Sequence, residues 1–104
     1  MVKILFFDYR QLETIQGFAR RLEPPAKHSP EPLLSSTHPW GANSMSMYGS
    51  VIRRPGDGLF QMWYTTGGPE KGSVLAYAES RDGIAWERPE LDVVLWNGKG
   101  TNAV

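Results

Sequence analysis

Cysteine is absent from this chain of 104 residues, and neither sign of charge predominates. A chain without cysteine has no disulfide scaffold, no zinc–thiolate site and no cysteine nucleophile. Eleven basic and eleven acidic residues cancel, so no overall field attracts nucleic acid or an anionic membrane surface. We therefore expect neither nucleic acid nor a membrane among the partners.

Long hydrophobic runs are also lacking. The first apolar run is Ile4–Phe7, whereas a signal peptide needs about 7–15 apolar residues and a membrane helix about 20. The sequence thus predicts neither segment within this chain. It does not decide the compartment, since in a longer secreted or periplasmic protein an export signal would lie upstream of Met1.

Signatures of cofactor and metal sites are missing as well. His28 and His38 lie ten residues apart without a cluster of carboxylates or cysteines, which argues against a metal site. The Gly67-Gly68 pair lacks the Lys-Ser/Thr ending and the strand–glycine–helix setting of a phosphate-binding loop. We expect no cofactor.

Aromatic and turn-forming residues are plentiful, and beyond residue 45 they alternate in a pattern typical of strands and tight turns. Strand-forming stretches are separated by turns rich in glycine, with proline and aspartate in some, which predicts a four-stranded antiparallel meander, the size of one propeller blade. The predicted strands are 45–53, 59–66, 74–79 and 84–86, with turns at 54–58, 67–72 and 81–83.

The remaining segments are less regular. Residues 1–9 are predicted as a strand, and the five prolines within 23–44 exclude a regular element there. Apolar residues of 12–22 fall at helical spacing, although Gly17 costs a helix about 1 kcal/mol, so periodicity alone slightly favours a helix. The chain therefore divides into residues 1–44 with the Pro-rich loop, a four-stranded sheet of blade size (45–88) and residues 89–104.

The order and spacing of several short motifs over nearly the whole chain resemble the N-terminal part of five-bladed β-propeller proteins related to glycoside hydrolase families 43 and 32. The motifs are Lys27-His28 with Pro30, Pro32-Leu33-Leu34, His38-Pro39-Trp40, Tyr48–Ile52, Gln61–Tyr64, Tyr77–Pro89, Glu90-Leu91 and Asn97-Gly98. The resemblance implies an all-β fold in which this chain supplies blade one and the start of a second blade. It also implies that 12–22 is extended and lies against the propeller rather than forming a helix. Residues 1–44 are then an extended N-terminal segment with a Pro-rich loop, and residues 89–104 are a linker into the next blade.

The same resemblance implies a carbohydrate-active parent that hydrolyses glycosidic bonds. Such hydrolysis uses two carboxylates, and in these families one of them is an Asp on the innermost strand of blade one. The comparable position here is Tyr48-Gly49, and no acidic residue occurs between Glu31 and Asp57. The catalytic residues are therefore unknown, and we expect the chain alone to be inactive.

Carbohydrate-binding residues can still be suggested. Trp40 is a candidate stacking platform for a sugar ring, with pinning of the Pro-rich segment as its structural alternative, and His38 lies in the same loop. Asn43 and Tyr48 lie near the expected mouth of the central channel. Trp63, Tyr64, Trp86 and Asp82 are expected to have structural roles, with Asp82 bonding the amides of its own turn.

Two other functions remain open: a non-catalytic carbohydrate-binding or protein-interaction module, and a truncated piece without independent function. A lone blade would expose apolar faces and unpaired edges. We therefore expect self-association, with Phe60, Met62 and Leu75 as candidate contacts.

Overall fold

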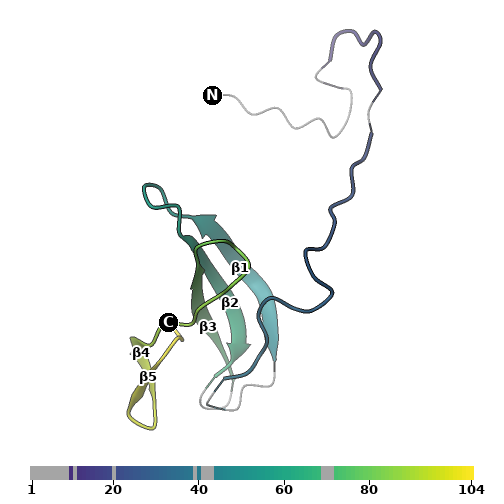
Figure 1. Cartoon of the computed structure of the whole chain (residues 1–104). Coiled ribbons are helices and arrows are strands. Elements are labelled where there is room, and N and C mark those ends of the chain that lie inside the picture. The colour runs from purple at the N-terminus through teal and green to yellow at the C-terminus, as the bar shows by residue number, and fades with distance from the viewer. Residues whose placement is uncertain (1–9, 11, 20, 39, 41–43, 69–71) are drawn as a thin grey trace.

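The computed structural model describes residues 10, 12–19, 21–38, 40, 44–68 and 72–104. This part of the chain contains strands and no helix, so the predicted all-β class is confirmed. Consequently it contains no helix that could span a membrane. Strands β1 (Met45–Arg53), β2 (Phe60–Gly67) and β3 (Ser73–Ser80) form an antiparallel sheet in that order, and β4 (Leu91–Trp96) pairs with β5 (Lys99–Thr101) in a separate hairpin (Figure 1).

Strand β1 contains a bulge, whereas β2 and β3 pair without interruption from Phe60–Ser80 to Gly67–Ser73. The register of β1 shifts between the pairs Ser46–Thr65 and Ser50–Trp63, so three residues of β1 lie opposite the single residue between Trp63 and Thr65. Gly49 lies in this bulge. A Cβ atom there would be 1.9 Å from the carbonyl oxygen of Trp63, so the close approach of the two strands requires glycine.

The hydrophobic core lies on one face of the sheet, because side chains alternate between the two faces along each strand. Met62 and Tyr64 of β2 and their cross-strand partners on β3 form its centre. Trp63 and Tyr77 lie on the opposite, half-buried face with ring centroids 5.4 Å apart. Trp63 and Tyr64 are neighbours in the chain and so lie on opposite faces, with Tyr64 in the core. The remaining core residues are Ala76 and Ala78, with Leu34, Met45 and Trp86 packed against them.

The predicted fourth strand at 84–86 is wrong. The Asp82 carboxylate oxygen Oδ1 accepts hydrogen bonds from the amides of Ile84 and Ala85, both at 2.8 Å. These amides face the turn and cannot enter a strand ladder, which also confirms the role predicted for Asp82. Strand pairing resumes at Glu87, which forms one antiparallel bridge with Glu79, while the Trp86 side chain packs against the core.

Residues 89–104, predicted as a linker, contain the β4–β5 hairpin and then return to the sheet. Asn97 and Gly98 at the tip have φ angles of 50° and 74°, as a two-residue type I′ turn requires. Ala103 pairs with Ala76 of β3. If the strand that begins at the Glu79–Glu87 bridge continued without interruption, residue 90 would lie opposite Ala76 instead. The hairpin is therefore an excursion of thirteen residues within the line of the fourth strand.

The described residues of the N-terminal segment contain no helix or strand, and the segment leads away from the sheet towards the N-terminus, whereas Leu34 packs against the core (Figure 1). The helical alternative for 12–22 is wrong over its described residues. The segment is extended, as the resemblance implies, but it does not lie against the sheet. Phe18 and Leu22 have exposed fractions of 86% and 89%, so no packing surface stabilises a helix there. The strand predicted at 1–9 lies outside the described residues.

Candidate functional site

Two of the predicted carbohydrate-binding residues, His38 and Trp40, stack on one another in the layer that covers the core. Their ring centroids are 4.4 Å apart with an interplanar angle of 15°, and His38 also stacks on Tyr64 at 6.2 Å. The indole Nε1–H of Trp40 donates to the carbonyl oxygen of Gly67 at 3.0 Å. Only 9% of Trp40 is exposed, so the structure supports the alternative in which it pins the Pro-rich segment to the sheet.

Tyr48 has a different environment from this stack. It lies in the bulge of β1 with 84% of its surface exposed, so its ring is available to a ligand. Asn43, the fourth predicted residue, lies outside the described residues. The structure thus brings His38 and Trp40 together as packing residues and leaves Tyr48 as the accessible aromatic side chain among the four.

His38 is buried near a positive charge. Burial, together with the charge of Arg88, lowers the pKa of His38 from 6.5 to about 4. The Arg88 guanidinium donates to the backbone carbonyls of Ser35 and Thr37 and so fastens the Pro-rich segment to the residue that follows the Glu79–Glu87 bridge. His38 Nε2 and Arg88 Nε are both buried without a hydrogen-bond partner. A proton on His38 would therefore be poorly accommodated.

The lowered pKa of His38 predicts a pH dependence of stability. Unfolded histidine binds a proton below pH 6.5, whereas folded His38 does so only below about pH 4. The free energy of unfolding should therefore fall as the pH is lowered from 6.5 towards 4. Urea unfolding at pH 7 and pH 5 measures this. His38→Phe keeps an aromatic ring in the stack and should remove most of the difference; an equal difference in the variant would contradict the prediction.

The pKa values of two carboxylates, Asp57 and Asp82, are also shifted, but both are lowered. Hydrogen bonds from Arg54 and from the Leu59 amide lower the pKa of Asp57, and hydrogen bonds from the amides of Ile84 and Ala85 lower that of Asp82. The stability that each carboxylate adds is present above its ordinary pKa near 3.8 and is lost only at lower pH.

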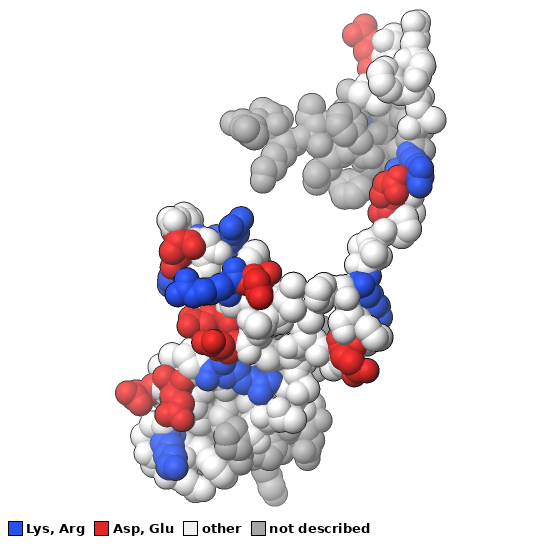
Figure 2. Space-filling view, viewed as in Figure 1, with Lys and Arg blue, Asp and Glu red and all other residues white. Residues whose placement is uncertain are grey.

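A pocket of about 310 Å³ lies at one end of the sheet, between the β1–β2 turn, the turn that follows β3 and the Glu79–Glu87 bridge. Its lining residues are charged or polar, apart from the apolar Leu59 and Ala85. Figure 2 shows basic and acidic side chains next to one another at the end of the sheet that carries the β1–β2 turn. The lining residues are Arg54, Leu59, Glu79, Ser80, Arg81, Asp82, Ala85 and Glu87.

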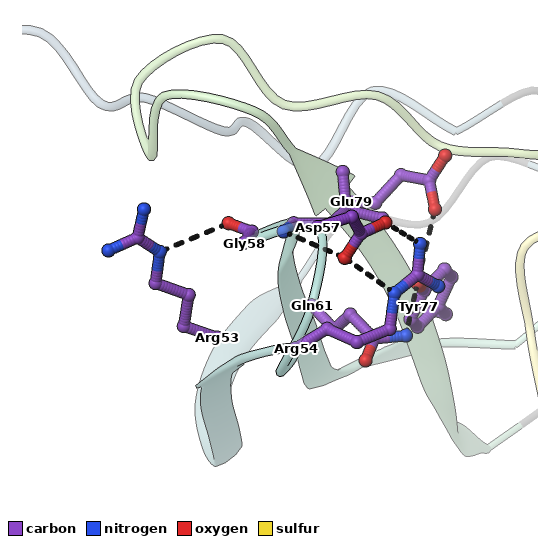
Figure 3. A network of polar contacts seen from close by, with 8 residues as sticks. Arg53, Arg54, Asp57, Gly58, Gln61, Tyr77 and Glu79 are labelled. Carbon is purple, nitrogen blue, oxygen red and sulfur yellow. Dashed lines mark hydrogen bonds and ion pairs between the residues drawn. The ribbon is translucent and has the colours of Figure 1, made fainter.

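The β1–β2 turn holds Arg54 in a fixed position on this pocket. The guanidinium Nε of Arg54 donates to Asp57 Oδ1 at 2.9 Å, and its Nη2 contacts the second carboxylate oxygen, which gives a paired contact (Figure 3). Asp57 in turn accepts from the amide of Leu59 at 3.3 Å. Proline and two glycines with positive φ, Gly56 and Gly58, let the chain reverse tightly enough for these contacts.

Two glutamates from adjacent strand segments also line the pocket. Glu79 and Glu87 exchange backbone hydrogen bonds of 2.9 and 2.8 Å, and cross-strand partners of this kind project their side chains from the same face. The Tyr77 hydroxyl donates to Glu79 Oε2 at 3.2 Å and accepts from Gln61 Nε2 at 2.9 Å (Figure 3). These bonds orient Glu79 before any ligand arrives.

Arg54, Glu79 and Glu87 were not among the site residues predicted from the sequence. The available signal was the position of the two glutamates on either side of the Ser80–Trp86 turn, since a turn that closes back on its own strand brings its two ends together. Glu79 and Glu87 can pair because the Asp82 carboxylate accepts hydrogen bonds from the amides of Ile84 and Ala85 and so keeps these residues in a turn.

Comparison with protein-family models found none that matches, and neither the curated proteins nor the solved structures gave a match. Within the described part of the chain, no group of three or more His, Cys, Asp or Glu side chains is arranged to hold a metal ion.

Proposed function

We propose that this chain is a blade of a carbohydrate-active β-propeller of the type found in glycoside hydrolase families 43 and 32, and that its sheet-end pocket binds carbohydrate. The motif order in the sequence and the antiparallel β1–β2–β3 sheet support the blade. Glu87 and Ala103, both on the outer side of β3, occupy the line that a fourth blade strand would follow. In the parent protein, other blades would supply the catalytic site that hydrolyses glycosidic bonds.

The composition of the pocket is the observation that carries the binding proposal. Its volume of about 310 Å³ falls at the lower end of the range for ligand sites. Carboxylates of Glu79 and Glu87 can accept hydrogen bonds from sugar hydroxyls, and Arg54 can donate to hydroxyl or ring oxygens. Leu59 and Ala85 provide apolar surface for the C–H face of a sugar ring.

Binding without cleavage is the activity proposed for this chain alone. Glycosidases place two carboxyl groups on either side of the scissile bond. The strand that carries one of these carboxylates in families 43 and 32 has Tyr48-Gly49 at the comparable position, and β1 contains no acidic residue. We therefore expect no glycosidase turnover by the 104-residue chain.

The binding proposal is tested by titrating neutral oligosaccharides into the chain and measuring heat or amide chemical shifts. Glu87→Gln removes the charge of one acceptor and should weaken binding about tenfold, because hydrogen bonds to charged groups contribute about 1.5–3 kcal/mol. Glu31→Gln, which changes an exposed carboxylate in the N-terminal segment, is the matched control and should bind normally.

A second variant separates the pocket from the predicted aromatic platform. Tyr48→Ala removes an exposed ring from β1 and should leave pocket binding unchanged. Loss of binding in Tyr48→Ala with normal binding in Glu87→Gln would assign the sugar to the β1 bulge instead. Failure of every oligosaccharide to bind would leave the protein-interaction alternative, which the exposed β1 edge favours.

A further inference from the structure

The two edges of the three-stranded sheet differ sharply. The outer side of β3 is covered, because Glu79 exchanges backbone hydrogen bonds with Glu87, Tyr77 N–H donates to Asn102 and Val104 N–H donates to Leu75. Strand β1 lies at the other edge, and within the described residues its outer side pairs with no strand. The sheet therefore has one closed edge and one open edge.

The pairing pattern shows which backbone groups face the open edge. The backbone N–H and C=O of Glu79 bond to Glu87 and so point away from β2. Gln61, which lies opposite Glu79 on β2, therefore directs its own N–H and C=O away from β3 and towards β1. Its partner on β1 is Ile52. Hydrogen-bonding direction alternates along a strand, so Val51 and Arg53 direct their N–H and C=O groups away from β2. No described strand pairs with these groups, so they can form a ladder with another strand.

The side chains of β1 do little to protect this edge. Met47, Tyr48, Val51 and Ile52 are large apolar residues with exposed fractions between 48% and 84%. The strand contains no acidic residue and no proline, and its single charge, Arg53, lies at its C-terminal end. Natural edge strands are commonly protected by charged residues, proline or bulges; here the bulge covers the first half, and residues 50–53 are regularly paired.

We propose that β1 is the interface for a second copy of this chain, which pairs with it in antiparallel orientation to give one continuous six-stranded sheet. Antiparallel pairing of identical strands is self-complementary and closes on a two-fold axis. With the pairing centred on Val51, the regularly paired residues 50–52 of the two copies face one another, and Arg53 of each copy lies beside the bulge at Gly49 of the other. The two cations are therefore at opposite ends and meet no like charge. A parallel arrangement would bring the two Arg53 side chains together.

Assembly stops at two chains because the outer edge of β3 is already covered in each copy. The interface also differs from the contacts expected from the sequence. Met62 is only 9% exposed and packs in the core, so it cannot contact a second chain as predicted. This inference does not rest on carbohydrate binding, since the pocket lies away from the open backbone groups of Val51.

Sedimentation of the full chain over a range of concentrations tests the proposal. We expect the average mass to rise from the monomer value of 11.7 kDa towards twice that value. A single strand pair buries less than the roughly 800 Å² per partner of a standard interface, so the dissociation constant should be in the micromolar range.

Two variants of β1 and one control define the interface. Val51→Pro removes an outward-facing N–H without removing a β1–β2 hydrogen bond, and Ile52→Lys adds like charges near the two-fold axis. Each should weaken the dimer at least tenfold while keeping the circular dichroism of a folded sheet; if Val51→Pro fails to fold, Ile52→Lys decides. Ile15→Lys makes the same chemical change at an exposed position of the N-terminal segment and should leave the dimer intact.

Three outcomes would overturn the proposal. The first is a monomer at every concentration up to hundreds of micromolar. The second is a dimer that persists unchanged in folded Val51→Pro and Ile52→Lys. The third is a dimer lost in Ile15→Lys but kept in the β1 variants, which would assign the contact to the N-terminal segment.

Discussion

Gly49→Ala should be the most destabilising single substitution in the sheet. The added Cβ would lie 1.9 Å from the carbonyl oxygen of Trp63 and 2.7 Å from its carbonyl carbon. Both are backbone atoms, so no side-chain rotation relieves the clash, and β1 would have to separate from β2. We expect a loss of more than about 3 kcal/mol, at the severe end of single substitutions, measured by urea or thermal unfolding.

Ser50→Ala is the neighbouring control for this substitution. Ser50 lies next to the bulge on the exposed strand and already has a Cβ atom, so its replacement should change the free energy of unfolding by no more than about 0.5 kcal/mol. A Gly49→Ala variant as stable as Ser50→Ala would show that β1 does not approach β2 as closely as described.

Asn102→Ala should give the second large effect, because one side chain joins the segment beyond the hairpin to the core. Its amide Nδ2 donates to the Tyr64 hydroxyl and to the Tyr77 carbonyl, both at 2.8 Å, and Asn102 is only 4% exposed. Alanine would leave both acceptors buried without this donor. We expect a loss of about 2–4 kcal/mol, since a buried group without a partner costs about 1–3 kcal/mol.

A double-mutant cycle with Tyr64→Phe separates the two hydrogen bonds. Tyr64→Phe alone removes the hydroxyl and should cost less than Asn102→Ala, because Asn102 keeps its bond to Tyr77. The double variant should then lose less than the sum of the two single losses. Strict additivity would contradict a direct contact between Asn102 and Tyr64.

The parts of the fold that the sequence predicts well are those decided by local alternation and turn chemistry. In β2 and β3 every second side chain is buried, and the turns after β1 and β2 contain the glycines that reverse the chain. The fourth strand was mispredicted because Ile84 and Ala85 are apolar, whereas the decisive interaction is the capture of their amides by Asp82. A side chain that accepts backbone hydrogen bonds can override the hydrophobicity of the residues it binds.

The candidate site was predicted less well because it depends on contacts distant in sequence. Aromatic residues suggest sugar platforms, but the exposure of a ring is decided by tertiary packing: Trp40 binds a carbonyl 27 residues away, and Tyr48 is left outside by a bulge. The pocket forms only where the β1–β2 turn at Arg54 lies next to the C-terminal end of β3 and to residues 85–87 after the turn that follows it. The bulge has one local signal, Gly49 inside the strand pattern, whereas the contact of these three segments has none.

The β4–β5 hairpin has a consequence for the order in which the molecule folds. Without it, pairing Ala103 with β3 after the Glu79–Glu87 bridge would require closure of a flexible loop, whose entropy cost grows with its length. A hairpin with a two-residue turn forms within microseconds and brings Leu91 next to Thr101. Once the hairpin has formed, only a few flexible residues separate Glu87 from Ala103 along the chain. Ala103 can then pair with the outer edge of β3 soon afterwards.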